Sequence, residues 1–246
     1  MTRPDRWTVG ATVTPAHRQR LTAAGVPAEL LDSLDLRAIV DADLPEWWPG
    51  SGSAIYLAPG VEIPEGLLEK LTLYPFIDVL IVIATDIPHV VSLLVGGDDE
   101  LIFLGPACAL TAAEIYCGAG SSIVLLGHAV ATRCAIIDAR NGGSIFADDD
   151  QLWAADVYVA TDDMHRLEDA ATGARLNPYG GRIRLGRHVW LCRDVIVTGD
   201  VEIGDGAVVG TRAMVRNQKV PAMVAVGGTP ARVLREGVTW NGEDRP

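Results

Sequence analysis

The chain has 246 residues, which suits one large domain or two small ones at about 150 residues per domain. Hydrophobic residues make up 49% and charged residues 21%, so a disordered chain is excluded and a buried core is expected. Acidic residues outnumber basic ones 32 to 20, and the net charge of -12 argues against nucleic acid as a partner. The 26 glycines and 14 prolines favour short, frequently turning segments.

The apolar stretches and the cysteines favour a cytoplasmic protein. The first ten residues, MTRPDRWTVG, are charged and contain a proline, so neither a secretory leader nor an anchor is expected. The most apolar stretch, residues 79–95, is interrupted by an acid, a proline and a histidine, so no membrane span is expected. The four cysteines contain no CxxC pair and indicate buried thiols rather than a zinc site or disulfides: Cys108, Cys117, Cys134 and Cys192.

The first elements along the chain are predicted to be helical and then β-rich. Apolar residues recur at helical spacing over residues 14–41, after a threonine-proline pair that suits a helix start, so one or two short helices are expected. A turn-rich stretch, WWPGSGS at 47–53, is followed by predicted strands at 54–57 and 77–84. The turn GGDD at 96–99 ends this part of the chain.

A period of six residues runs through residues 185–220. In blocks of six the segment reads LGRHVW, LCRDVI, VTGDVE, IGDGAV, VGTRAM and VRNQKV. Every first position is aliphatic, every fifth position is aliphatic until Lys219, and glycine takes the second position three times. Glycine suits a corner with an unusual or closely approached backbone. The first positions are Leu185, Leu191, Val197, Ile203, Val209 and Val215.

The period predicts a coil of short parallel strands. An α-helix has no period of six, and a series of hairpins would need longer turn signals. If each block is one strand and one corner, three blocks close a triangular turn with the first position pointing inward. The alternative is an ordinary parallel sheet in which the spacing arises by chance. The fold class is therefore expected to be mainly β, a parallel β-helix with a smaller mixed N-terminal domain.

One break in this register lies between His165 and Ile183. Before it, Ala147, Trp153 and Val159 are again six residues apart. An insertion that leaves a rigid repeat supplies polar groups that the repeat lacks, so function is expected at the break.

These patterns divide the chain into three predicted regions. Residues 1–98 form a mixed α/β domain of unknown role, which caps the coil, contacts an acceptor or assists assembly. Residues 99–236 form the β-helix, with a protruding loop near 164–182. Residues 237–246 form a tail, and the end of the chain is expected to cap the open edge of the coil.

Five segments carry a resemblance to a known family: TDDMH (161–165), TGARLNP (172–178), IRLGRHVWL (183–191), VEIGDGAVVG (201–210) and VGGTPARVLREGVTW (226–240). They resemble the hexapeptide-repeat acyltransferases, which have a left-handed β-helix, and within these the bacterial polysaccharide O-acetyltransferases of the polysialic acid type. The repeat specifies only the fold. The order of D-x-H, loop, H-V-W and G-x-P-A-R-V is more specific.

The resemblance implies a homotrimer that binds acetyl-CoA between subunits and uses a loop histidine as the catalytic base. His165 occupies that position, and Trp190 matches the tryptophan that helps to orient the thioester and the acceptor. Three departures concern the acyl-CoA contacts: Cys192 replaces a common glycine, Thr229 stands where asparagine or serine is usual, and RNQ at 216–218 replaces a lysine-rich turn.

The chemistry needs a base that removes the hydroxyl proton, and an imidazole titrates in the right range. Asp162 and Asp163 precede His165 closely enough for one of them to orient the ring and stabilise the imidazolium. Asp163 is the candidate for this role. A solvated histidine beside an acidic turn is the alternative. The separations of 37 and 23 residues among His128, His165 and His188 do not match a carbonic-anhydrase metal site, so no metal is expected.

The other candidate site residues lie on the coil. Trp190 takes an outward position, which suits contact with a neighbouring subunit or a flat ligand, or else a rim aromatic. Basic residues near the end of the coil are candidates for binding CoA phosphates, or else solvated charges. Glycine amides there are candidates for the pantetheine arm. The predicted CoA-binding residues are Gly210, Arg212, Lys219, Thr229 and Arg232.

Together these features predict a cytoplasmic, homotrimeric, acetyl-CoA-dependent O-acetyltransferase that acts on a carbohydrate hydroxyl. Two alternatives remain open: an N-acetyltransferase that acts on an amino sugar or another amine, and a non-catalytic β-helix scaffold.

Overall fold

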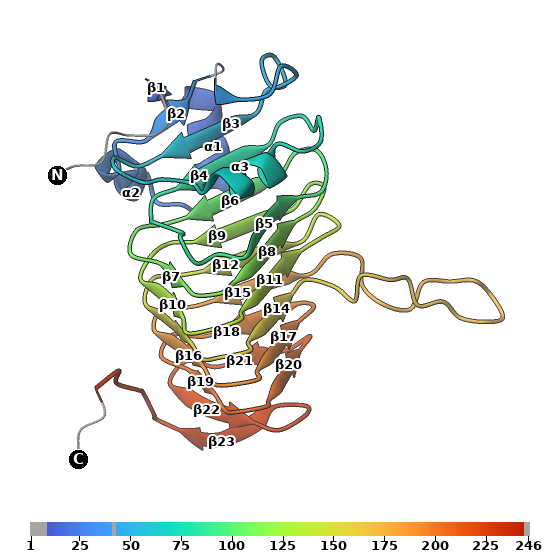
Figure 1. Cartoon of the computed structure of the whole chain (residues 1–246). Helices are drawn as coiled ribbons and strands as arrows, with labels where there is room; N and C mark the ends of the chain where they lie inside the picture. Colours follow the sequence, from blue (N-terminus) through green and yellow to red (C-terminus); the bar gives the residue numbers. More distant parts are fainter. Residues whose placement is uncertain (1–8, 41–42, 244–246) are drawn as a thin grey trace.

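The structure, a computed structural model, describes residues 9–40 and 43–243. Three sheets form the faces of a β-helix, with 10, 7 and 6 strands (Figure 1). Apart from the first strands and the last one, every neighbouring pair is parallel. The mainly β, hexapeptide-repeat architecture predicted from the sequence is therefore confirmed.

Within each sheet the strands stack along the coil, each bonded to the next. The 10-stranded sheet contains β1 (Val9–Thr12), β2 (Arg37–Ile39), β3 (Ala54–Leu57), β4 (Leu80–Ile83), β6 (Leu101–Leu104), β9 (Ser122–Leu125), β12 (Ser144–Ala147), β15 (Arg182–Leu185), β18 (Val201–Ile203) and β21 (Lys219–Val220). The 7-stranded sheet contains β23 (Arg232–Glu236), β22 (Val224–Gly227), β19 (Val208–Val209), β16 (Val189–Leu191), β13 (Gln151–Trp153), β10 (Ala129–Ala131) and β7 (Ala109–Leu110). The 6-stranded sheet contains β20 (Met214–Arg216), β17 (Ile196–Thr198), β14 (Tyr158–Ala160), β11 (Ile136–Ala139), β8 (Glu114–Cys117) and β5 (Ser92–Val95).

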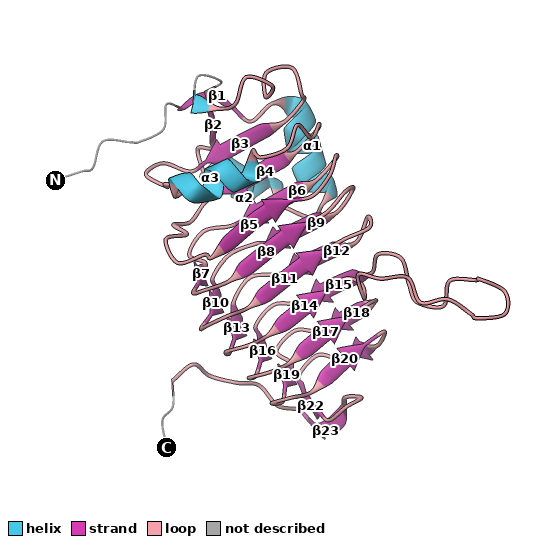
Figure 2. Ribbon diagram, turned by 45° about the vertical axis from the view of Figure 1, so that its right-hand side comes forward, coloured by secondary structure: helices cyan, strands magenta, loops and turns pink. Residues whose placement is uncertain are grey.

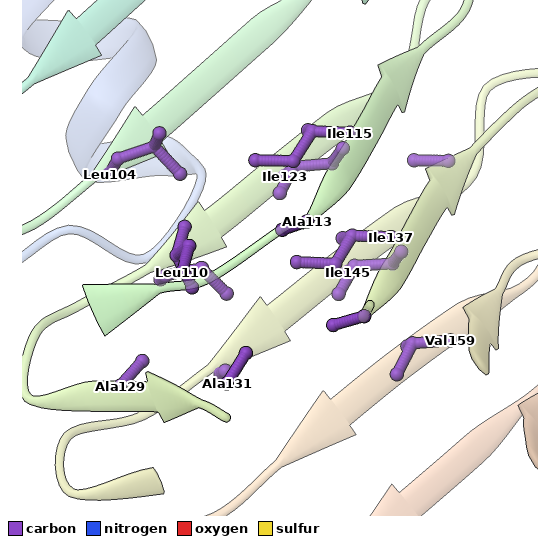
Figure 3. Close-up of a cluster of buried hydrophobic side chains, with 14 of the residues drawn as sticks. Leu104, Leu110, Ala113, Ile115, Ile123, Ala129, Ala131, Ile137, Ile145 and Val159 are labelled. Carbon is purple, nitrogen blue, oxygen red and sulfur yellow. The ribbon is translucent and has the colours of Figure 1, made fainter. Parts of the chain in front are cut away.

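The rungs stack in register, so equivalent side chains lie above one another inside the coil. Ile123 pairs with Ile145, which pairs with Ile183 on the next strand. Figure 3 shows Ile123 and Ile145 among the apolar side chains that fill the interior. Burying one such side chain contributes about 1.5–3 kcal/mol, so the column is a main source of stability.

The six-residue period corresponds to this inward column. The first-position residues, from Leu185 to Val215, are all at most 1% exposed. Lys219, which breaks the pattern at the fifth position, is exposed and forms an ion pair with Glu202, with Nζ and Oε2 2.6 Å apart. The prediction that the first position of each block points inward is confirmed.

The corner glycines are required by close approach between rungs. A Cβ on Gly186 would lie 2.8 Å from the Asp205 nitrogen, and one on Gly204 would lie 2.5 Å from the Ala222 nitrogen. Neither glycine has a positive φ. The left-handed backbone instead falls two residues later, at His188 with φ of 59° and at Gly206 with φ of 67°. The second position is therefore selected for lack of a side chain, not for its φ.

The coil begins upstream of residue 99, the start predicted from the sequence. Strand β4 pairs in parallel with both β3 and β6, so the 10-stranded sheet runs through the predicted boundary without a break. The period is hidden here because both faces are covered. Leu80 and Val82 point away from the interior and pack in a second apolar cluster with Leu21 of α1.

The helices of the described residues, three in number, lie at this end of the coil (Figure 2). Two of them, α1 (Pro15–Ala23) and α2 (Ala28–Ser33), lie in the segment predicted to be helical, and the Thr14 hydroxyl accepts the first cap hydrogen bond from the His17 amide. The third, α3 (Glu65–Leu71), was not predicted and buries Leu67, Leu68 and Leu71. None of the helices in the described part of the chain is long and apolar enough to cross a bilayer. Residues 1–8 of the predicted N-terminal domain lie outside the described residues.

The other end of the coil is closed by β23, which pairs antiparallel with β22 and covers its edge. The predicted tail follows, and its residues 244–246 lie outside the described residues. All four cysteines are free thiols. Within the described ranges, no group of three His, Cys, Asp or Glu side chains has an arrangement that could hold a metal ion.

Candidate active site

A long loop leaves the coil between β14 and β15, where the sequence predicted a break in register. It joins the 6-stranded to the 10-stranded sheet and projects far from the coil (Figure 2). Its two arms are held together by main-chain hydrogen bonds, from Leu176 to Leu167 and from Asp169 to Ala174, each 2.8 Å long. The loop is therefore an ordered arm, with His165 near its root.

His165 is exposed on the outgoing arm. Its amide donates to the Asp163 carbonyl over 2.7 Å, and its carbonyl accepts from the Asn177 side chain over 2.7 Å. Among the described residues, no group is hydrogen-bonded to its imidazole. The backbone is thus fixed while the ring remains free to meet a ligand.

Most of the other histidines use their rings in structural contacts. The His17 ring lies 2.8 Å from the Tyr56 hydroxyl, and burial lowers its pKa. The rings of His128 and His188 bond to the carboxylates of Asp149 and Asp150 over 2.7 and 2.6 Å. In the described part of the chain, only His89 shares with His165 a ring without such a partner.

Asp162 fixes the turn that leads into the loop. Its carboxylate is 6% exposed and accepts from the Met164 amide over 2.7 Å and from the Asn141 side chain. Met164 has a φ of 63°, a left-handed conformation that this turn holds in place. Asp162 therefore shapes the backbone before His165 and does not face the imidazole.

Asp163, the candidate named for orienting the imidazole, faces a different group. Its Oδ2 lies 2.8 Å from the Arg216 guanidinium and 3.4 Å from Nδ2 of Asn177. A guanidinium is a strong partner for a carboxylate because the hydrogen bond is charge-assisted. No contact between Asp163 and the imidazole supports the orienting role, and Asp163 instead ties the loop to β20.

A polar cluster beneath the loop makes its root rigid. Arg140 forms two hydrogen bonds with Asp138, at 2.7 and 2.9 Å, and its amide donates to the Thr161 hydroxyl over 2.8 Å. The hydrogen bond to Asp138 raises the pKa of Arg140. The guanidinium also lies 4.0 Å from the centre of the Tyr116 ring. Because every charge here is paired, the cluster supports the loop without competing for a ligand.

Trp190 is half-buried on β16, in the 7-stranded sheet. The loop with His165 arises at the corner between the other two sheets. The two residues therefore belong to different faces of the coil, and one chain does not bring them together.

The sequence did not reveal a neighbour of Trp190 in the tail. The Trp240 ring lies 6.2 Å from that of Trp190 and stacks on His188, with centroids 4.1 Å apart and planes 4° from parallel. Its Nε1 donates to the His188 carbonyl over 2.8 Å, and the His188 ring lies 3.0 Å from the Trp240 carbonyl. The only sequence signal was an aromatic residue beyond the last repeat.

The predicted CoA-binding residues fall into two groups on the coil. The Thr229 hydroxyl, after β22, donates a long hydrogen bond of 3.4 Å to the main-chain carbonyl of Arg212, after β19. Lys219 and Arg232 line a groove of about 220 Å³ at the end of the coil. The Gly210 amide already donates to the Val226 carbonyl over 2.8 Å, as the parallel ladder requires, so it is not available for pantetheine.

Comparison with known proteins agrees with this architecture. No family model matches the chain. The polySia specific acetyltransferase NeuO superposes with a TM-score of 0.55 at 21% identity, over 70% of this chain and 77% of that one. The chain has the fold of a hexapeptide-repeat acetyltransferase. In this hexapeptide-repeat coil, the loop with His165 is the largest departure from the regular rungs (Figure 1).

Two curated relatives match shorter segments. The chloramphenicol acetyltransferase of Agrobacterium fabrum is 36% identical over 74 residues, which cover 30% of this chain and 34% of that protein. The putative colanic acid biosynthesis acetyltransferase WcaF of Escherichia coli is 48% identical over 56 residues, which cover 23% of this chain and 30% of that protein. The hexapeptide-repeat chain thus spans about a third of the length of these relatives.

Proposed function

We propose that the protein is an acetyl-CoA-dependent O-acetyltransferase that acts on a hydroxyl of a carbohydrate or glycan. The observation that carries this proposal is the free imidazole of His165 on an ordered loop of a hexapeptide-repeat coil. Acetyltransferases recur among the proteins with a similar fold or local sequence.

His165 serves as the general base in this reaction. The acceptor hydroxyl attacks the thioester carbonyl carbon while the imidazole removes its proton, which forms a tetrahedral oxyanion. Collapse of this intermediate breaks the carbon–sulfur bond, and the imidazolium returns the proton to the departing thiolate. The products are the acetyl ester and free CoA, and the base is regenerated.

The complete site forms between copies of the chain, in a homotrimer. His165 and Trp190 lie on different faces of one coil, so a neighbouring copy has to supply one of them. The loop also exposes Leu167, Leu176 and Tyr179 by 59–66%, an apolar content that suits contact with another subunit. Trp190 then forms part of the site wall opposite the loop.

The donor is held by cations near the end of the coil, Arg212, Lys219 and Arg232, with Thr229 beside them. Arg212 pairs with Asp194 at 3.2 Å and Lys219 with Glu202 at 2.6 Å, both on the surface. Solvent screens exposed pairs strongly, so CoA phosphates can replace these carboxylates at little cost. Acetyl-CoA is thus a substrate here, and the chemistry proposed needs no metal.

The acceptor class rests on the names of relatives. The galactoside O-acetyltransferase of Escherichia coli is 36% identical over 58 residues, 24% of this chain and 28% of that protein. WcaF is named as a putative acetyltransferase of colanic acid biosynthesis. A sugar hydroxyl is therefore the first acceptor to test. We place the protein in the cytoplasm, where its free thiols stay reduced.

Replacing His165 by alanine tests the proposal. Release of free thiol from acetyl-CoA is measured with a panel of sugars, oligosaccharides and matched amino sugars. We expect His165→Ala to lower kcat by about 10²–10⁴-fold while the assembly stays intact. The control is His89→Ala, another exposed ring without a partner among the described residues, which should retain activity.

Three results would contradict the proposal. Full turnover by His165→Ala would show that His165 is not the general base. Transfer to amines alone would favour the N-acetyltransferase. Absence of thermal stabilisation by acetyl-CoA would favour the scaffold, because ligand at 100 times its Kd should stabilise the folded state by about 2.7 kcal/mol.

A further inference from the structure

Asn177, on the returning arm of the loop, bonds to the chain on both sides of His165. Its side chain is 8% exposed, although the loop projects into solvent. Its Nδ2 donates to the His165 carbonyl over 2.7 Å, and its Oδ1 accepts from the Leu167 amide over 2.8 Å. One planar amide thus bridges the outgoing and returning arms at the position of His165.

The same amide reaches the group that ties the loop to the coil. Its Nδ2 lies 3.4 Å from the Asp163 carboxylate, which bonds to Arg216 of β20. Arg175 holds Asn177 from the other side, by donating to its carbonyl over 2.8 Å and to that of Pro178 over 3.1 Å. A continuous set of bonds therefore runs from the coil to the backbone of His165.

Only a primary amide fits these contacts. The position needs an acceptor for one main-chain amide and donors for a carbonyl and a carboxylate, and an asparagine side chain supplies both. An aspartate of the same shape keeps the acceptor but loses the donors, and its charge faces the carboxylate of Asp163. Asn177→Asp is therefore a nearly isosteric change that breaks the bridge.

We infer that Asn177 is a positioning residue for the reaction, which sets where the His165 imidazole can reach. The inference rests on the proposed function of His165. It also gives Asp163 a different role from the one expected from the sequence: with Arg216, it anchors the bridge to the coil rather than orienting the ring. A displacement of about 1 Å at a reacting group can cost about 10²-fold in rate, so a bridge at this position affects turnover.

The test compares Asn177→Asp and Asn177→Ala with the wild type in the full-length assembly. We expect kcat to fall by about 10–100-fold and KM for acetyl-CoA to stay within about 3-fold, because donor contacts lie on the coil. The melting temperature and the assembly mass should not change. Gln19→Glu is the control, since it makes the same change from amide to carboxylate on an exposed position of α1.

A second measurement does not depend on activity. Trypsin should cleave after Arg166 faster in both Asn177 variants than in the wild type or the control, because the arms of the loop are no longer bridged. Wild-type kcat in the variants would overturn the inference. A fall in kcat accompanied by a lower melting temperature would also overturn it, because general destabilisation would then explain the loss. If His165→Ala is fully active, the proposed function fails, and the trypsin result still shows whether the bridge exists.

Discussion

Two columns of side chains in the 10-stranded sheet, one facing the interior and one facing outward, differ in how their burial and charge change along the coil. The inward column is apolar from end to end, and no member is more than 3% exposed: Ile55, Ile81, Ile102, Ile123, Ile145, Ile183 and Val201. The outward column changes from buried apolar to exposed charged residues: Tyr56, Val82, Phe103, Val124, Phe146, Arg184, Glu202 and Lys219.

The difference follows from what covers the sheet. Helices α1 and α2 pack on its first rungs, and the outward side chains there join them in a second apolar cluster. Beyond Phe146 no helix of the described chain covers the outward side, so charged residues appear. The backbone is the same parallel coil throughout. A period of six in a sequence therefore reports burial on one side only, and it disappears where both sides are buried.

The largest expected effect tests the covered outward column. Phe103→Ala should lower the free energy of unfolding by about 3–5 kcal/mol, because the ring is fully buried between the sheet and the helices. Glu202→Ala, in the same column but exposed, should leave it nearly unchanged, because the ion pair with Lys219 lies on the surface. Urea unfolding of both variants checks the comparison, and equal losses would refute it.

The inward column should show no such contrast. Ile102→Ala in the covered region and Ile183→Ala in the open region should each cost about 2–5 kcal/mol, since both side chains are at most 1% exposed. The measurement is again urea unfolding. A loss at Ile183 much smaller than at Ile102 would mean that the open rungs are not packed as the structure has them.

How much of the fold and of the site could be predicted depends on how far apart in the sequence the contacting residues lie. The rungs of 185–220 could be predicted because each repeat packs on its neighbours and carries its own signal. The break that carries His165 was visible as a gap in the same signal. The partners of Asp163 and Trp240 were not visible, because Arg216 and His188 lie 53 and 52 residues away, a separation far longer than one repeat. The Asn177 bridge was hidden because a loop has no period.

A smaller effect concerns Glu100, at a corner close to the helices. Burial raises the pKa of this carboxyl to about 8, and its Oε2 has no hydrogen-bond partner among the described residues. The folded state holds the proton more tightly than the unfolded chain, whose carboxyl titrates near 4.5. Its contribution to stability is therefore fully present below pH 4.5 and is lost as the pH rises towards 8.

Glu100→Gln should remove this part of the pH dependence. We expect the variant to gain about 1–3 kcal/mol on the wild type at pH 8, with a much smaller difference at pH 5. Melting temperatures at the two pH values measure the change. A difference that is the same at both would show that the carboxyl ionises normally in the folded chain.

The proposed site combines the loop of one chain with the coil of another. Mixed assemblies of His165→Ala and Trp190→Ala subunits, each with its own affinity tag and isolated through both tags, separate this arrangement from a site within one chain. We expect mixing to restore thiol release well above that of either variant alone, since some interfaces pair an intact loop with an intact coil. Mixed assemblies no more active than the better single variant would contradict a site shared between subunits.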